Sequence, residues 1–253
     1  MTNFAVLLGP ILIGVLMAYL LIGVYMVQLY HYAADDCILA ARTRLHILVG
    51  FVTVAEVTNI VFITRSSWRI LIGGVERPDL ILIPPATSVG TPILNGVTAC
   101  FVQCFFAWRI TRLSGTRFKW VRHTIPALVV AIALLQLSAA CVTAAKVCFV
   151  QLQRQFVLVY RLKLPVTLYL SASLACDSLI TISMIYILLN FKAATELSTT
   201  KRLLNWLIFH AVENGAITTV CAALNLAFYI GRPQDAIQFT FQFLIGRLYA
   251  MTG

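Results

Sequence analysis

Long apolar runs separated by short polar stretches cover most of this chain. Each run can cross a bilayer as a helix, which takes about 20 residues. Inside hydrocarbon the backbone must satisfy its own hydrogen bonds, and the runs are far too long for barrel strands, so each is predicted to be an α-helix. The predicted helices cover residues 5–30, 45–64, 88–110, 121–150, 164–189, 203–230 and 236–251.

This pattern predicts an all-α protein, a polytopic transmembrane bundle of about seven helices. The helices and their short connections use up the 253 residues, so we expect a single domain over 1–253. The first run, 5–30, follows no Lys or Arg and is much longer than the apolar core of a secretory signal, about 7–15 residues. It is therefore interpreted as a retained first helix.

The Lys and Arg residues between the helices predict the orientation. With the N-terminus outside and the C-terminus cytoplasmic, the inner side carries the larger share of the 19 basic residues, Arg247 included. Most of the signal comes from the loop 109–122, which contains no acid. Its basic residues are Arg109, Arg112, Arg117, Lys119 and Arg122.

Composition supports a membrane protein. The chain is 60% hydrophobic and 11% charged, with a mean hydropathy of +0.91, and a water-soluble core cannot hide that much apolar surface. The net charge of +10 does not indicate a nucleic-acid partner, because the basic residues lie between apolar segments and not along one face. Membrane lipids with anionic headgroups are the expected partners. The pattern does not distinguish the plasma membrane from the endoplasmic reticulum.

Neither a metal nor a cofactor is predicted. The seven cysteines form no CxxC pair, and His210 has no second histidine at ligand spacing. We interpret the cysteines as small packing residues and His210, taken alone, as a helix-contact residue.

Three carboxylates lie inside predicted helices: Glu56, Asp177 and Glu213. At about 1.5 Å of rise per residue, each is roughly 15–20 Å from its helix end, close to the bilayer midplane. A charge there costs at least about 2.5 kcal/mol on insertion scales, so all three are expected to face the bundle interior or a cavity.

Neighbouring polar residues predict a pocket around these carboxylates. Spacings of three or four place side chains on one helix surface. No Lys or Arg is expected at the midplane, so the carboxyl groups would be protonated, share protons, pair with His210 or bond to amides and hydroxyls. Polar groups that only hold helices together are the alternative interpretation. The predicted pocket contains Glu56, Asn59, Ser173, Asp177, His210, Glu213 and Asn214.

Four short strings give the chain a family resemblance: VQCFFAWRI at 102–110, DSLI at 177–180, NG at 214–215 and RLYA at 247–250. Together they resemble a seven-helix membrane family, abundant in mushroom-forming fungi, that is catalogued only as a domain of unknown function. The resemblance covers nearly the whole chain. It implies a fold and no activity.

Three functions fit these observations. The first is a receptor-like or lipophilic-ligand-binding membrane protein with a polar intramembrane pocket. The second is an integral-membrane terpene cyclase acting on a polyprenyl substrate, with Glu56, Asp177 or Glu213 as the buried acid that donates a proton. The third is proton or cation transport through the carboxylate layer. The sequence leaves open whether the protein is an enzyme.

Overall fold

The computed structural model describes residues 4–34, 43–76, 87–114, 119–153, 163–194, 198–231 and 237–252, apart from the side chains of some of these residues. All of these residues except two turn residues are helical, so the prediction of an all-α protein is confirmed for the described part of the chain. The helices are α1 (Phe4–Ala34), α2 (Thr43–Leu71), α3 (Gly73–Glu76), α5 (Thr87–Leu113), α6 (Lys119–Gln153), α7 (Lys163–Ala194), α8 (Ser198–Gly231) and α9 (Ile237–Thr252).

Five of these helices are long and apolar enough to cross a bilayer, namely those that contain Leu8–Ala34, His46–Leu71, Val89–Leu113, Arg122–Phe149 and Lys163–Ala193. The protein is therefore an integral, multi-pass membrane protein. The apolar part of α8 within the described residues is shorter, Gly215–Gly231, and α9 has only 16 residues. At about 1.5 Å per residue, α9 is roughly 24 Å long, slightly less than a hydrocarbon layer of about 30 Å.

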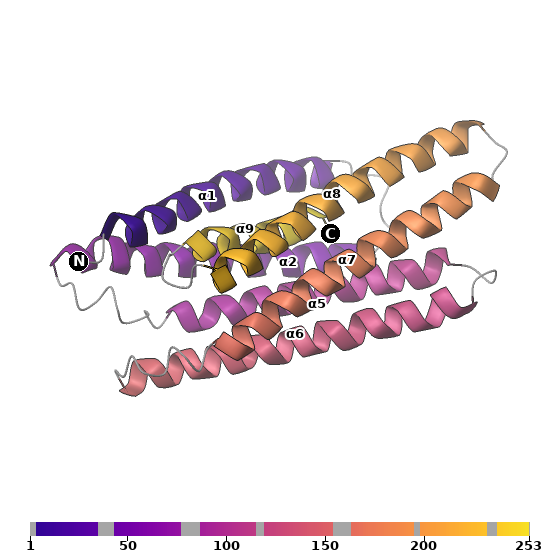
Figure 1. The fold of residues 1–253 in the computed structure, drawn as a ribbon. Coiled ribbons are helices and arrows are strands. Elements are labelled where there is room, and N and C mark those ends of the chain that lie inside the picture. Colours follow the sequence, from indigo (N-terminus) through magenta and orange to yellow (C-terminus); the bar gives the residue numbers. More distant parts are fainter. Residues whose placement is uncertain are drawn as a thin grey trace.

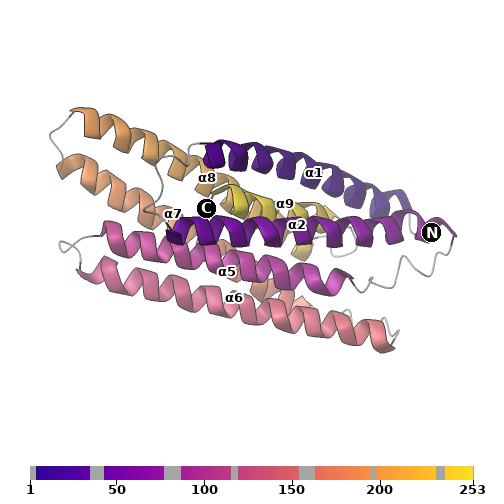
Figure 2. The same cartoon turned by 180° about the vertical axis from the view of Figure 1, so that it is seen from behind.

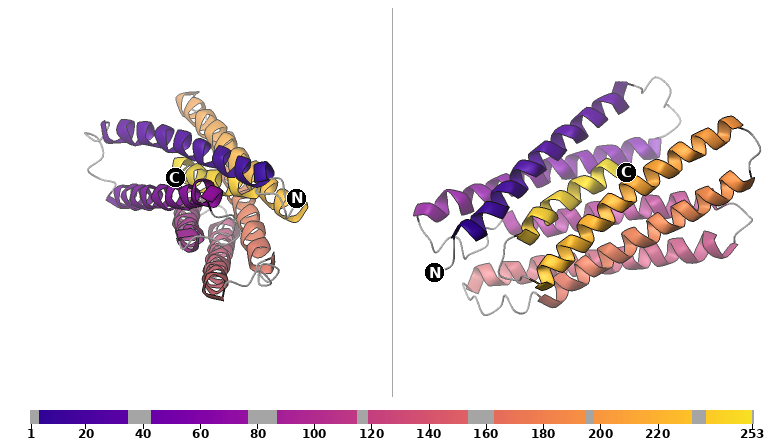
Figure 3. Two further views of the ribbon diagram at one scale, coloured as in Figure 1. Left: turned by 90° about the vertical axis from the view of Figure 1, so that its left-hand side faces the viewer. Right: turned by 45° about the horizontal axis from the view of Figure 1, so that its top comes forward.

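Successive long helices alternate in direction along the bundle (Figure 1). Helix α5 packs against α6, α6 against α7, and α7 against α8, which completes one side of the bundle. Helices α1 and α2 lie on the other side, as the view from behind also shows (Figure 2). The short α9 lies between α1 and α8 and also contacts α2 and α5 (Figure 3).

Glycines allow two of these helix pairs to approach closely. A Cβ atom added at Gly14 of α1 would lie 2.9 Å from the backbone Cα of Thr240 in α9, and one at Gly96 of α5 would lie 2.8 Å from Ala140 of α6. Thr240 also donates its hydroxyl to the carbonyl of Pro10 at 2.7 Å, which ties α9 to α1. Small residues at helix contacts are typical of membrane bundles, where close packing stabilises association.

The bundle exposes apolar side chains and buries polar ones. Leu16 and Leu20 of α1, for example, are 61% and 60% exposed. Polar and charged side chains on α2, α5, α6, α7 and α9 are buried instead, as expected where the surroundings are lipid. These buried polar side chains form the candidate site.

Candidate functional site: a buried polar cluster

Nine side chains from five helices form what we name the polar cluster, and each is no more than 5% exposed. Helix α2 contributes two of them, α5 two, α6 one, α7 two and α9 two. The members are Glu56, Asn59, Asn95, Gln103, Gln136, Ser173, Asp177, Arg247 and Tyr249.

Asp177 is held by a tyrosine from another helix. The hydroxyl of Tyr249 donates to Oδ2 of Asp177 at 2.5 Å. The hydroxyl of Ser173, one turn before Asp177 on α7, lies 2.8 Å from the same tyrosine oxygen. Because a phenol has one hydrogen and Tyr249 gives it to Asp177, Ser173 is the donor in that second bond. The chain Ser173 to Tyr249 to Asp177 thus joins α7 to α9.

A pair of glutamines extends this network toward α5 and α6. Gln103 donates from Nε2 to Oε1 of Gln136 at 3.0 Å, and the Gln103 side chain is also a hydrogen-bond partner of the Asp177 carboxyl group. One hydrogen-bonded network therefore connects four helices, α5, α6, α7 and α9.

The other carboxylate of the cluster forms an ion pair. Oε2 of Glu56 lies 3.8 Å from Nε of Arg247, and each of the two side chains is 1% exposed. Arg247 donates from Nη1 to the carbonyl of Phe243, one turn earlier on α9, at 2.8 Å. Among the described residues, both oxygens of Glu56 and the Nε and Nη2 atoms of Arg247 have no hydrogen-bond partner. The pair is thus in electrostatic contact with much of its hydrogen-bonding capacity unused.

Two asparagines lie beside this ion pair. Asn59, one turn after Glu56 on α2, donates from Nδ2 to Oδ1 of Asn95 on α5 at 2.6 Å. Gly246 of α9 lies against them, since a Cβ there would be 2.8 Å from Oδ1 of Asn95 and 3.5 Å from Nδ2 of Asn59. The absence of a side chain at Gly246 therefore makes room for the asparagine pair next to Arg247.

The short helix α9 joins the two halves of the cluster. Arg247 and Tyr249 are two residues apart, which corresponds to about 3 Å along a helix and about 200° around it. Arg247 accordingly reaches Glu56 on α2 while Tyr249 reaches Asp177 on α7. One turn of α9 therefore contacts both carboxylates, Glu56 on α2 and Asp177 on α7.

The predicted pocket residues have different outcomes. The structure brings Glu56, Asn59, Ser173 and Asp177 into the polar cluster. His210 and Asn214 belong to α8, but their side chains lie outside the described residues.

The prediction that Glu213 faces the interior is wrong, because its side chain is exposed. On α8 the buried side is marked by Thr218, Ala222 and Asn225. Glu213 precedes Thr218 by five residues, about 140° around the helix, so it points away from that buried side.

Arg247 overturns a second expectation. The pattern of basic residues predicts Arg247 on the inner side, with no cation at the midplane. The structure buries it completely, ten residues after Ile237, the first residue of α9. That separation is about 15 Å along the helix. The sequence contains a signal for this burial, because Arg247 falls inside the predicted apolar helix 236–251. A basic residue inside such a helix is expected to pair with an acid.

Four members of the polar cluster were not predicted as site residues: Tyr249, Asn95, Gln103 and Gln136. All four lie within predicted helices, and Gln103 and Tyr249 fall within strings that carry the family resemblance. A search that starts from carboxylates and their neighbours on the same helix overlooks them. Uncharged polar residues in membrane helices are equally informative, because each must find a partner away from lipid.

Comparisons with known proteins find one family that is similar to part of the chain. Residues 173–252 match the model of a family described as a family of unknown function, DUF6534. The matched part runs from Ser173 to Thr252, so it contains the α7 and α9 members of the polar cluster but not Glu56. No curated protein and no solved structure matched the chain. The fungal source and the seven-helix character implied by the resemblance remain predictions.

The cluster offers hydrogen bonding and paired charge more than metal chemistry. Among the described residues, no group of three or more His, Cys, Asp or Glu side chains is arranged to hold a metal ion. What the cluster presents is a carboxylate and a guanidinium side by side, with free acceptor and donor atoms, next to an amide pair. Such a set can bind an uncharged polar group from both its donor and its acceptor side.

Proposed function

We propose that the protein is a receptor-like membrane protein that binds a lipophilic ligand with one polar group, and that this group binds between Glu56 and Arg247. The observation that supports it is the unsatisfied ion pair. Both side chains are at least 99% buried, yet both Glu56 oxygens and two Arg247 nitrogens lack hydrogen-bond partners among the described residues. Buried polar atoms are nearly always bonded, so an exception in a membrane interior favours a ligand-binding role.

The chemistry of the pair indicates the class of ligand. A hydroxyl group can donate to Glu56 and accept from Arg247 at once, which a hydrocarbon cannot do. The apolar residues Val52 and Val102 pack in one cluster on α2 and α5, the helices that carry Glu56 and Asn95. A long-chain alcohol, of which polyprenyl alcohols are an example, has both the hydroxyl and the apolar body required.

The position of the pair suggests how binding would produce a signal. Glu56 and Arg247 link α2 to α9 across 3.8 Å. A ligand that hydrogen-bonds to both side chains would weaken their direct attraction and so change the preferred distance between these helices. A ligand can shift such an equilibrium only by its difference in affinity for the two arrangements. The proposal therefore predicts that the charge of Glu56 affects affinity.

Binding of tritiated farnesol to the purified full chain in nanodiscs tests the proposal. We expect saturable binding that is at least about tenfold weaker in Glu56→Gln. Glu213→Gln is the matched control, because it makes the same carboxylate-to-amide change at an exposed position, and it should bind like the parent protein. No saturable binding, or equal binding in Glu56→Gln, would reject the proposal.

The same preparation distinguishes the other two functions. Incubation with a polyprenyl precursor followed by mass spectrometry would reveal cyclised product, and loss of that product in Asp177→Asn would identify a terpene cyclase. Current or proton flux across liposomes containing the protein would identify transport. Either result would replace the receptor-like proposal.

We also propose that the N-terminus lies outside and the C-terminus in the cytoplasm. The support is the basic segment 109–122, which covers the end of α5, the start of α6 and the connection between them, and which contains no acid. Because Arg247 is buried, it no longer counts toward the inner side. The remaining difference in the number of Lys and Arg residues between the two sides depends mainly on this segment.

A further inference from the structure

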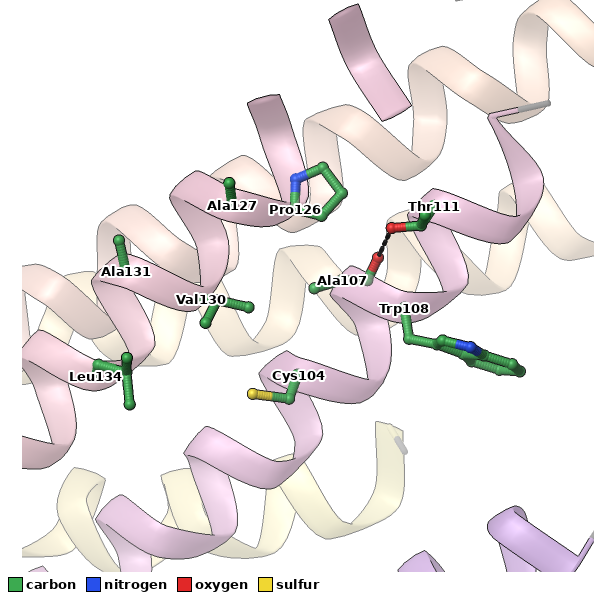
Figure 4. Close-up of a pocket in the computed structure, with 9 residues that line it drawn as sticks. All are labelled: Cys104, Ala107, Trp108, Thr111, Pro126, Ala127, Val130, Ala131 and Leu134. Atoms are coloured by element: carbon green, nitrogen blue, oxygen red, sulfur yellow. Dashed lines mark hydrogen bonds between the residues drawn. The ribbon is translucent and has the colours of Figure 1, made fainter. Parts of the chain in front are cut away.

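A groove on the outer surface of the bundle lies between α5 and α6, on residues that the polar cluster does not use. It has a volume of about 590 Å³ and is open along one side. Figure 4 shows Cys104 and Ala107 on α5 opposite Val130 and Leu134 on α6. Pro126 and Trp108 also line it, toward the ends of the helices where α5 ends and α6 begins.

The groove is apolar and faces the surroundings of the bundle. Leu134 is 56% exposed and Trp108 is 43% exposed. Thr111, which also lines the groove, donates its hydroxyl to the carbonyl of Ala107 at 2.9 Å, so its only polar hydrogen is already used. Such a surface suits a hydrocarbon chain and offers little to a polar solute.

Two arginines lie at the end of the groove nearest the basic loop. The guanidinium of Arg112 lies over the ring of Trp108, 5.6 Å from its centroid. Arg122 precedes Pro126 by four residues, one turn along the same face of α6. The Nε atom of Arg122 is buried and has no hydrogen-bond partner among the described residues. The apolar groove therefore ends beside two guanidinium groups, one of which has a free donor.

Neither α5, α6 nor the loop between them contains a carboxylate that could balance this charge. The sequence contains no Asp or Glu between Thr87 and Gln153, a stretch that spans both helices and the loop between them. Arg112 is exposed and Arg122 is partly exposed, and neither has a carboxylate partner on α5, on α6 or on the loop between them. Arginine binds phosphate oxygens with parallel hydrogen bonds, which makes it a suitable partner for a phosphate group at a membrane surface.

We propose that this groove binds a single anionic phospholipid, with one acyl chain lying between Cys104 and Leu134 and the headgroup phosphate held by Arg112 and Arg122. The acyl chain would contact the apolar side chains of the groove. The phosphate would bind the arginines near the end of α5 and the start of α6. The site is independent of the Glu56 and Arg247 pair. It also agrees with the orientation proposed above, because anionic lipids are concentrated in the cytoplasmic leaflet.

Quenching of Trp108 fluorescence by brominated lipid tests this site. Substituting Trp68, Trp120 and Trp206 by Phe leaves Trp108 as the single tryptophan of the full chain. This protein is placed in phosphatidylcholine nanodiscs in which one fifth of the lipid is brominated phosphatidylserine or, in parallel, brominated phosphatidylcholine. We expect at least twofold more quenching by the serine lipid. Equal quenching by the two lipids would overturn the proposal.

Two variants separate a site from a general surface charge. The double variant Arg112→Gln, Arg122→Gln should abolish the excess quenching, whereas Arg202→Gln, at an exposed arginine near the start of α8, should preserve it. Ala131→Leu fills the groove and changes no charge, because Ala131 lines it and is exposed. Loss of the excess in Ala131→Leu supports a groove-bound lipid. If Ala131→Leu leaves the excess quenching unchanged, the serine lipid is attracted only by the general surface charge, and the site is rejected.

Discussion

Arg247 of α9 and Glu56 of α2 form an ion pair in the interior of the bundle, with Nε and Oε2 separated by 3.8 Å. Each residue explains the presence of the other. A lone charge buried among membrane helices is costly, and an opposite charge at this distance offsets part of that cost. The pair also fixes how α9 is oriented relative to α2, since a rotation of α9 by one residue would carry the guanidinium about 100° away.

Neutralising one member of this pair should destabilise the protein more than neutralising both. Glu56→Gln and Arg247→Gln each leave one buried charge without its partner, and we expect each to cost about 3–5 kcal/mol. In the double variant no charge remains, so its loss should be smaller than the sum of the two single losses by at least about 1 kcal/mol. Thermal unfolding followed by the circular dichroism of the helices measures all three. Strictly additive losses would show that the two side chains do not interact.

Removing the hydroxyl of Tyr249 should cost about 1–3 kcal/mol. Tyr249→Phe deprives Asp177 of a donor and Ser173 of its acceptor, and a buried polar group left unbonded carries a penalty of this size. Tyr30→Phe is the control, because that ring is 71% exposed, and it should change the unfolding midpoint little. An equal effect of the two substitutions would contradict the buried network.

Adding a methyl group at Gly246 should destabilise the bundle by about 1–3 kcal/mol, through overpacking. The new Cβ would lie 2.8 Å from Oδ1 of Asn95, which cannot move freely because it accepts a hydrogen bond from Asn59. Gly23→Ala on α1 should be neutral or stabilising, since nothing lies within 4 Å of its added Cβ and Ala favours a helix by about 1 kcal/mol over Gly. Unfolding midpoints of the two variants compare the sites directly. Similar shifts would argue against close packing at Gly246.

The proposed orientation predicts where a glycosylation acceptor will be modified. An Asn-X-Thr tag placed before Met1 should be glycosylated in a eukaryotic membrane, because that end is expected to face the lumen or the outside. The same tag inserted between Leu113 and Lys119 should stay unmodified. A mobility shift on a gel, reversed by a glycosidase, reports the outcome. Modification of the second position in place of the first would reverse the orientation.

Apolar periodicity was enough to predict the helices, but not how far they extend. The helix predicted over 45–64 continues to Leu71 as α2. Ser66 and Ser67, which end the apolar run, are buried at 7% and 4% exposure, and Ser66 is hydrogen-bonded to Thr87 at 2.5 Å. Polar residues mark where hydrocarbon contact stops. They do not end the backbone hydrogen bonds of a helix.

Sequence reasoning placed two of the three carboxylates correctly and missed their partners. Glu56 and Asp177 are buried, whereas Glu213 is exposed. Depth along a helix can be counted from sequence, but rotation about the helix axis depends on which neighbours it packs against. For the same reason Arg247 and Tyr249, two residues apart and facing different helices, could not be matched to Glu56 and Asp177 without the structure.

The placement of these contacts on α9 has a consequence for biosynthesis. Helices α2 and α7 leave the ribosome before α9, so Glu56 and Asp177 enter the membrane before Arg247 and Tyr249 have been made. During that interval two acids lack the partners that they have in the finished protein. A nascent chain arrested before Ile237 should therefore stay bound to insertion chaperones or be degraded, and arrival of the last helix would be the step that releases it.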